Sequence, residues 1–208
     1  MATKDEILTR LLKEENYVSG EELARQTGVS RAAVWKAIKS LKKSGYDIEG
    51  VTKCGYKLKQ NNSLVTAEGV KALLEKDIEV THFDTVDSTN TYCKRLLADG
   101  KQGEFLVTAA KQTAGRGRQG KSFYSPSETG IYFSLVIRPD TSLQNAVTAT
   151  TAAAVAVCKA IEKTTDLKPK IKWVNDVYLN GKKVCGILTE AQLGLETGRL
   201  EYAVLGMG

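Results

Sequence analysis

The segment Lys111-Gln112-Thr113-Ala114-Gly115-Arg116-Gly117-Arg118-Gln119-Gly120-Lys121-Ser122 decides which fold the larger part of this 208-residue chain can have. Its glycines fit the dinucleotide pattern G-x-G-x-x-G, and residues 115–122 also fit the P-loop pattern G-x-x-x-x-G-K-[ST]. Both motifs require a helix that begins at the loop, because its first amides must meet the phosphates. The chain continues instead with Phe123-Tyr124-Ser125-Pro126-Ser127 and a strand-like run from Gly130, so no helix fits. We therefore interpret both pattern matches as fortuitous, and a P-loop NTPase is the least favoured class.

The chemistry of this glycine loop still indicates a ligand. Its glycines let the backbone approach a bound molecule closely. Arg116 and Arg118 supply fixed, bidentate donors that suit phosphate or carboxylate groups. With Gln112 beside them, they predict a loop that closes over an anionic ligand. An exposed basic hairpin is the alternative interpretation.

The sequence around the loop, residues 64–208, alternates helix and strand signals without an internal repeat. The expected helices are 66–75, 88–98 and a buried, alanine-rich helix over 143–163, with Thr66 and Ser88 as caps. The expected strands are 78–84, 104–110, 130–137, 171–174, 177–179, 184–192 and 200–205. Asn180-Gly181 has the residues of a two-residue hairpin turn. These elements predict an α+β domain with a mixed or largely antiparallel sheet.

Residues 1–60 have the pattern of a winged helix-turn-helix. Helices are expected over residues 4–15, 19–27 and 31–43, the last with Ser30 as its cap and an inward stripe of Val34, Ala37, Ile38 and Leu41. Gly28-Val29 supplies the turn between the second and third helices. Segments 48–51 and 56–58 predict a two-stranded wing. The polar string of residues 60–63 is typical of a linker to the second domain, which we expect over 64–208.

The charge distribution favours DNA as a partner of the first domain. Residues 1–59 hold 12 Lys and Arg against 8 Asp and Glu, and no acid lies between Glu22 and Asp47. Such a basic stripe is typical of a protein that binds the phosphate backbone. The predicted DNA-contacting residues are Ser30, Arg31, Ala32, Trp35, Lys36 and Lys39. A merely solvated basic face is the alternative, and for Trp35 we favour packing in the core over contact with DNA.

Several other classes are not favoured. No apolar run reaches the roughly 18 residues of a membrane span, and the N-terminus has no signal-peptide core, so we expect a cytoplasmic protein without a membrane partner. The four cysteines form no C-x-x-C pair and the chain has one histidine, so no zinc site is expected. That histidine, His82, lies in an alternating stretch that is typical of a strand rather than of a catalytic base.

Four separated motifs carry a resemblance to a known family. The loop Lys111–Gly120 resembles the biotin-binding loop of biotin protein ligases. Asp87-Ser88-Thr89-Asn90 resembles the family's D-S-T-N element, and Lys172-Trp173-Val174-Asn175-Asp176 resembles its K-W-P-N-D element, with Val174 in place of proline. Val184-Cys185-Gly186-Ile187-Leu188-Thr189-Glu190 is similar to its K-x-x-G-I-L-x-E segment. With the winged helix in front, the resemblance covers nearly the whole chain and points to the bifunctional ligase-repressor subgroup.

The resemblance implies an activity and a set of site residues. The family joins biotin to ATP, giving biotinyl-5′-adenylate and pyrophosphate, and then passes biotin to a lysine of a carrier domain. The implied catalytic residues are Lys172, Arg118 and Asp176. The implied biotin-binding residues are Ser88, Thr89, Asn90, Gln112, Gly115, Arg116, Gly117, Arg118, Lys172 and Gly186. The implied nucleotide-binding residues are Arg116, Arg118, Gln119, Gly120, Phe123 and Asn175, and Mg²⁺ would act on the phosphates without an assigned protein ligand.

The resemblance also implies partners and a domain plan. The expected partners are the biotin carboxyl carrier domain of acetyl-CoA carboxylase, operator DNA and a second copy in a ligand-promoted homodimer. The fold implied for 64–208 is a class II synthetase-like catalytic domain. Because Gly206-Met207-Gly208 resembles only the opening of the family's G-x-G-x-N strand, we expect the C-terminal part and the small β-barrel to be absent. A biotin-sensing DNA-binding regulator without catalysis is the alternative function.

Overall fold

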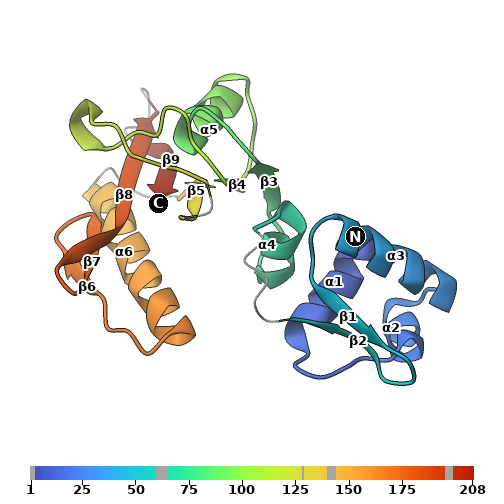
Figure 1. Ribbon diagram of the computed structural model, residues 1–208. Coiled ribbons are helices and arrows are strands. Elements are labelled where there is room, and N and C mark those ends of the chain that lie inside the picture. Colours follow the sequence, from blue (N-terminus) through green and yellow to red (C-terminus); the bar gives the residue numbers. More distant parts are fainter. Residues whose placement is uncertain (1–2, 60–64, 128, 140–143, 195–198) are drawn as a thin grey trace. The chain divides into compact units, whose positions relative to one another are not determined.

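The chain folds as two compact units, Met1–Asp77 and Ile78–Gly208 (Figure 1). The computed structural model describes residues 3–59, 65–127, 129–139, 144–194 and 199–208. The linker predicted at residues 60–63 lies outside the described residues. The division falls later than the predicted start of the second domain at residue 64, because helix α4 (Ala67–Leu73) belongs to the first unit. The hydroxyl of Thr66, which caps α4, is hydrogen-bonded to that of Tyr46, and Lys4 Nζ lies 3.4 Å from Glu68 Oε1.

The rest of the first unit is the winged helix-turn-helix that the sequence predicts. It consists of α1 (Thr3–Lys13), α2 (Gly20–Thr27), α3 (Arg31–Lys43) and the antiparallel hairpin of β1 (Ile48–Val51) and β2 (Gly55–Leu58). The side chains of Ser19 and Ser30 cap α2 and α3, and Gly28 ends α2 at a φ of +66°. The predicted inward stripe of α3 is confirmed, since Val34, Ala37, Ile38 and Leu41 all join the core.

The expected packing of Trp35 in the core is wrong. Its side chain is 55% exposed, and Lys39 Nζ lies 5.2 Å from the centre of its ring. The reason is its position on α3: Trp35 follows the buried Val34, and the next residue along a helix faces about 100° away.

The second unit is built on one mixed sheet, with the strand order β3-β4-β5-β9-β8-β7-β6 among the described residues. The strands are β3 (Glu79–Phe83), β4 (Phe105–Ala109), β5 (Tyr132–Ile137), β6 (Lys170–Lys172), β7 (Asp176–Leu179), β8 (Lys182–Leu193) and β9 (Leu200–Met207). In this sheet β3 and β4 are parallel and the other neighbouring pairs are antiparallel. The prediction of a mixed, largely antiparallel sheet is therefore confirmed.

Helices α5 (Thr89–Ala98) and α6 (Gln144–Thr164) pack on opposite faces of β8. Asn90 of α5 donates to Glu190 at 2.9 Å, whereas Thr150 of α6 lies 2.7 Å from the neighbouring Thr189, and successive strand residues point to opposite faces. The expectation that α6 is buried is only partly right. Ala154 is fully buried against the sheet, but Val155 is 42% exposed, because one face of this helix contacts the strands.

Candidate functional site

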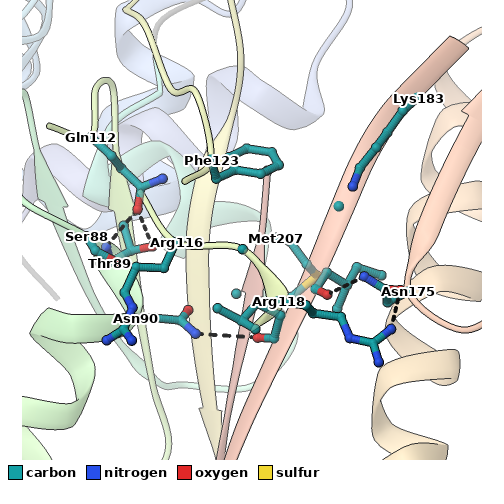
Figure 2. Close-up of a pocket in the computed structure, with 16 residues that line it drawn as sticks. Ser88, Thr89, Asn90, Gln112, Arg116, Arg118, Phe123, Asn175, Lys183 and Met207 are labelled. Carbon is teal, nitrogen blue, oxygen red and sulfur yellow. Dashed lines mark hydrogen bonds between the residues drawn. The ribbon is translucent and has the colours of Figure 1, made fainter. Parts of the chain in front are cut away.

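A small cavity lies where the start of α5, the glycine loop and the facing parts of β8 and β9 meet (Figure 2). Its lining residues are Ser88, Thr89, Asn90, Gln112, Arg116, Gly117, Arg118, Phe123, Asn175, Lys183, Gly186, Ile187, Leu188, Gly206, Met207 and Gly208. These residues are up to 120 positions apart in the sequence, between Ser88 and Gly208, so the sheet brings them together.

The D-S-T-N element forms the amino-terminal end of α5. The hydroxyl of Ser88 caps the helix by accepting from the Thr91 amide. Asp87 accepts from the Ser88 amide at 2.8 Å and is clamped by two Arg95 nitrogens at 2.6 and 3.1 Å. The hydrogen bond from Arg95 is the main cause that keeps the pKa of Asp87 below its ordinary value. This anchoring presents Ser88, Thr89 and Asn90 to the cavity, although each of the three is less than 5% exposed.

The base of the glycine loop is tied to the same segment. The amides of Thr113 and Ala114 donate to the carbonyls of Val86 and Asp87 at 2.9 and 2.8 Å. Gln112 accepts from the Thr89 amide at 2.9 Å, and its own amide nitrogen donates to Ser125 Oγ at 2.9 Å. The loop therefore holds Gln112 in one orientation beside α5.

Phe123 covers Gly186 of β8 and Gly208, which follows β9. A Cβ added at Gly208 would lie 2.8 Å from its ring, and one added at Gly186 would lie 3.1 Å from it. With the ring in this position, a side chain at residue 208 would displace it, and one at residue 186 would require a shift of a few tenths of an ångström. In Figure 2 this ring lies between Gln112 and Lys183. The cavity is partly open to solvent and has a volume of about 50 Å³, which holds a few water molecules at most.

Cationic side chains gather at the other end of the cavity. Arg118 Nη1 donates to Asn175 Oδ1 at 2.9 Å, which joins the glycine loop to the turn before β7 (Figure 2). Lys183 Nζ lies 2.8 Å from Asp176 Oδ1, and this contact is an ion pair without hydrogen-bond geometry. Arg118 and Lys183 thus lie at one end of the cavity, whereas Arg116 lies at the opposite end, beside the neutral groups of Thr89 and Asn90 (Figure 2).

Most of the predicted ligand-binding residues meet in this cavity. Ser88, Thr89, Asn90, Gln112, Arg116, Gly117, Arg118, Phe123, Asn175 and Gly186 line it. Gly115, Gln119, Gly120, Lys172 and Asp176 do not, although Gly115 lies against the Phe123 carbonyl and Asp176 contacts Lys183. Lys172 is exposed, and its Nζ lies 5.3 Å from the centre of the Tyr178 ring.

Sequence reasoning missed six lining residues, namely Lys183, Ile187, Leu188, Gly206, Met207 and Gly208. A signal for Lys183 was present, because it lies just before the predicted strand of residues 184–192, at the lysine position of the K-x-x-G-I-L-x-E segment. For Gly206 and Gly208 the signal was their match to the opening of the family's G-x-G-x-N strand.

The predicted DNA-contacting residues lie on the first unit. Ser30 caps α3. The exposed residues of this helix include all the other predicted ones, namely Arg31, Ala32, Trp35, Lys36 and Lys39. Arg31, Ala32 and Trp35 line a groove of about 690 Å³ between α3 and the wing, together with Thr52, Lys53 and other residues. Lys36 and Lys39 are on the same helix, α3, but do not line the groove.

Two features of the described residues bear on other kinds of site. They contain no group of three His, Cys, Asp or Glu that could hold a metal ion. They contain no helix that is both long and apolar enough to cross a membrane.

His82 lies on β3 with its Nδ1 2.8 Å from Thr108 Oγ1, which agrees with the predicted strand position. The described residues after Ser122, 123–127 and 129–131, are not helical, so the P-loop interpretation has no support.

Family models match both units. Residues 82–208 match the biotin/lipoate A/B protein ligase family, and residues 3–57 match an HTH domain. The first match spans more than half of the chain and includes the whole cavity. The chain therefore belongs to the biotin/lipoate A/B protein ligase family, and the predicted resemblance is confirmed.

Among individual proteins, the chain is similar to the "Bifunctional ligase/repressor BirA" of Bacillus spizizenii, with 37% identity over 92% of this chain and 59% of the relative. It is 32% identical to the protein of the same name from Escherichia coli, over 97% of this chain and 61% of that one. The chain thus spans about 60% of the length of these curated relatives.

The fold is shared with a solved structure, the biotin acetyl coenzyme A carboxylase synthetase from Helicobacter pylori with bound biotinylated ATP. The TM-score is 0.50 at 23% identity, over 63% of this chain and 60% of that one. This likeness confirms that the second unit has the fold of a biotin ligase catalytic domain.

Proposed function

We propose that this chain carries the biotin-activating site of an ATP-dependent biotin protein ligase that is also a biotin-responsive repressor. The observation that carries the proposal is the polarity of the cavity. One end offers the neutral hydroxyl and amide groups of Ser88, Thr89 and Gln112, with Arg116 beside them, and the other end offers Arg118 and Lys183 (Figure 2). Biotin has the same polarity, since its ureido ring is neutral and its carboxylate must meet the phosphates of ATP. The names of the curated relatives support the same activity.

Binding requires that the glycine loop and Phe123 move. The cavity volume of about 50 Å³ is far too small for biotin and a nucleotide together. Phe123 fills the position against Gly186 and Gly208, and in our proposal it swings away and then flanks the adenine. Gln119 and Gly120, which have positive φ angles of 55° and 75°, lie in the part of the loop that would close over the nucleotide.

In the first step a carboxylate oxygen of biotin attacks the α-phosphorus of ATP, and the bond to pyrophosphate breaks. Two anions approach each other, so the site must stabilise negative charge that grows in the transition state. In our proposal the positive charges of Arg118 and Lys183 stabilise it, and Asn175 holds the Arg118 guanidinium in place. Mg²⁺ would arrive on the phosphates of ATP, where it neutralises part of the charge of the leaving pyrophosphate.

In the second step the ε-amine of a carrier lysine attacks the acyl carbon of biotinyl-5′-adenylate. An amide bond forms, AMP leaves, and the amine loses a proton. Asp176 is the proposed acceptor of that proton, and its partner Lys183 keeps the carboxyl near the reacting groups. The carrier in this proposal is the biotin carboxyl carrier domain of acetyl-CoA carboxylase.

The regulatory part of the proposal places operator DNA along α3 and the wing. Arg31, Lys36 and Lys39 would contact phosphates, and Ser30, Ala32 and Trp35 would lie at the groove. The adenylate would act as corepressor by ordering the glycine loop and favouring a homodimer. We also propose that the protein is located in the cytoplasm.

The test is mass spectrometry of the full chain after incubation with biotin, ATP and Mg²⁺. We expect biotinyl-5′-adenylate, and its loss when Arg118 is replaced by Ala. A folded chain that binds biotin but forms no adenylate would favour the second candidate function, a biotin-sensing regulator without catalysis. A folded chain that binds neither biotin nor ATP would contradict both.

A further inference from the structure

The exposed side of α3 carries two apolar residues among its cations. Ala32 and Trp35 are three positions apart, so they are neighbours on one side of the helix near its amino-terminal end. Both residues are exposed, and the Trp35 side chain is 55% exposed although it is the largest on this helix. The hydrophobic core of the first unit is formed without either residue. Their apolar surface is therefore free to contact a partner.

The indole ring of Trp35 is held in place by a cation rather than by burial. Lys39 lies one helical turn further along α3, and its Nζ is 5.2 Å from the centre of the ring, which is the geometry of a cation–π contact. Trp35 and Ala32 line the groove between α3 and the wing, together with Val51 of β1, which is itself 39% exposed. The ring is thus ordered beside a groove that is open to a partner.

The charges around this apolar pair indicate what kind of partner it meets. Helix α3 has no acidic residue, and its five cations, Arg31, Lys36, Lys39, Lys42 and Lys43, are all exposed. Within the part of the chain that the structure describes, none of the five forms a salt bridge. Uncompensated cations on one helix favour a polyanion. A protein partner is less favoured, because charged residues are depleted at the centres of protein–protein interfaces.

Double-stranded DNA offers this apolar pair a single apolar group. The base edges in the major groove carry hydrogen-bond donors and acceptors, and the exception is the C5 methyl group of thymine. The amino-terminal turns of a recognition helix are the part that reaches these edges. The short side chain of Ala32 allows α3 to approach them closely, and Trp35 adds a large apolar surface beside it. Contact with a methyl group removes apolar surface of both partners from water, whereas contact with a hydrated phosphate does not.

We infer that Trp35, with Ala32 beside it, is a specificity-determining residue that recognises thymine methyl groups in the major groove. The inference rests on the proposed function, in which α3 binds operator DNA. Arg31, Lys36 and Lys39 contact phosphates and give affinity for any sequence. Trp35 makes that affinity depend on where thymine stands in the site.

The experiment compares two duplexes of about 40 base pairs by fluorescence anisotropy on the full chain, with biotin, ATP and Mg²⁺ present so that a ligand-promoted dimer can form. One duplex alternates dA and dT, so every base pair presents a thymine methyl and the operator sequence need not be known. The other has dU in place of dT, which keeps every hydrogen-bonding group and removes only the methyls. We expect the parent to bind the thymine duplex more tightly, by about 4-fold for each methyl that is buried.

Three variants assign the preference to a side chain. In Trp35→Ala it should fall below about 2-fold, because little apolar surface is left to meet the methyls. Trp35→Phe keeps a smaller aromatic ring and should retain part of the preference. Lys36→Ala is the matched control on the same exposed side of α3: it should weaken binding to both duplexes by the same factor and leave their ratio unchanged. Circular dichroism verifies that each variant is folded.

The outcomes separate this inference from the proposed function. Equal binding of the two duplexes by the parent would overturn the inference and leave DNA binding intact. A thymine preference that persists in Trp35→Ala, or that is lost equally in Lys36→Ala, would overturn the assignment to Trp35. A folded parent that binds neither duplex at low salt would overturn the DNA-binding part of the proposed function and this inference with it. A preference that is lost in Trp35→Ala and kept in Lys36→Ala would support the inference.

Discussion

Lys172 and Lys183 compete for the role of charge-stabilising lysine, and their surroundings differ. Lys172 was predicted as catalytic from its motif, but it is exposed on β6 and lies over the Tyr178 ring. Lys183 lines the cavity and pairs with Asp176. A preorganised cation acts on the transition state only if it lies beside the reacting groups. At the residue scale we therefore propose Lys183 for this role, and the catalytic role of Lys172 stays a prediction.

We expect Lys183→Met to lower the rate of biotinyl-5′-adenylate formation by about 10²-fold or more. Lys172→Met should lower it by less than about 10-fold, since its side chain does not line the cavity. Single-turnover assays with radiolabelled ATP would measure both rates, and circular dichroism would verify folding. The opposite order of effects would support the sequence prediction for Lys172 and contradict the proposal for Lys183.

The Lys94–Glu190 pair predicts a pH dependence of stability. The pKa of Glu190 in the folded chain is below its ordinary value of 4.5, so its carboxylate stabilises the fold fully above that pH. The contribution is lost as the pH falls through the lowered, folded-state pKa. Lys94→Met should therefore cost about 1 kcal/mol at pH 6 and progressively less toward pH 3, as measured by urea unfolding. A cost that does not change with pH would contradict this account.

At the scale of elements, α3 is a helix whose two faces have separate roles. Val34, Ala37, Ile38 and Leu41 hold it in the core, while Arg31, Lys36 and Lys39 remain exposed. The sequence was sufficient to predict this division, because helical periodicity fixes which residues share a face. It was not sufficient for Trp35, whose size suggested burial although its position on the helix is solvent-facing.

We expect Lys36→Ala to weaken DNA binding at every sequence and to reduce the slope of log K against log salt by about 1. The matched control is Lys13→Ala, an exposed lysine at the end of α1 that does not line the groove beside the wing. Fluorescence anisotropy with a pool of random 40-base-pair duplexes, at several salt concentrations, would measure the slope. An equal effect of both variants would mean that the binding surface is not α3.

At the scale of the whole molecule, the chain consists of two units whose boundary lies between Asp77 and Ile78. Helix α4 belongs with α1 through the Lys4–Glu68 pair and through the bond between Tyr46 and Thr66. A piece that ends at residue 77 should therefore fold more stably than one that ends at residue 60, where the sequence suggested the end of the domain.

We expect residues 1–77 to melt cooperatively, and at least about 5 °C above residues 1–60. Differential scanning calorimetry of the two pieces would measure the difference. The variant Tyr46→Phe in the longer piece, which removes the bond to Thr66, should lose part of this gain in melting temperature. Equal melting temperatures for the two pieces would show that α4 adds nothing to the first unit.

Local patterns determined much of this protein. Capping serines, the Asn180-Gly181 turn and alternating or helical periodicity predicted most elements, because these signals depend on neighbours in the chain. Four short motifs also predicted the family and most of the residues that line the cavity. The absence of a helix after Ser122 was sufficient to reject a P-loop.

Only the tertiary structure decided which residues meet. The sheet order places β8 beside β9 and both against α5, so Glu190, Ser134 and Gly206 reach Asn90 from three different strands. It also brought Lys183 into the cavity and left Lys172 outside it. The physical reason is that hydrogen bonds and ion pairs between distant residues depend on strand order and register. Those are fixed by burial of the whole sheet and cannot be derived from the neighbours of any one residue.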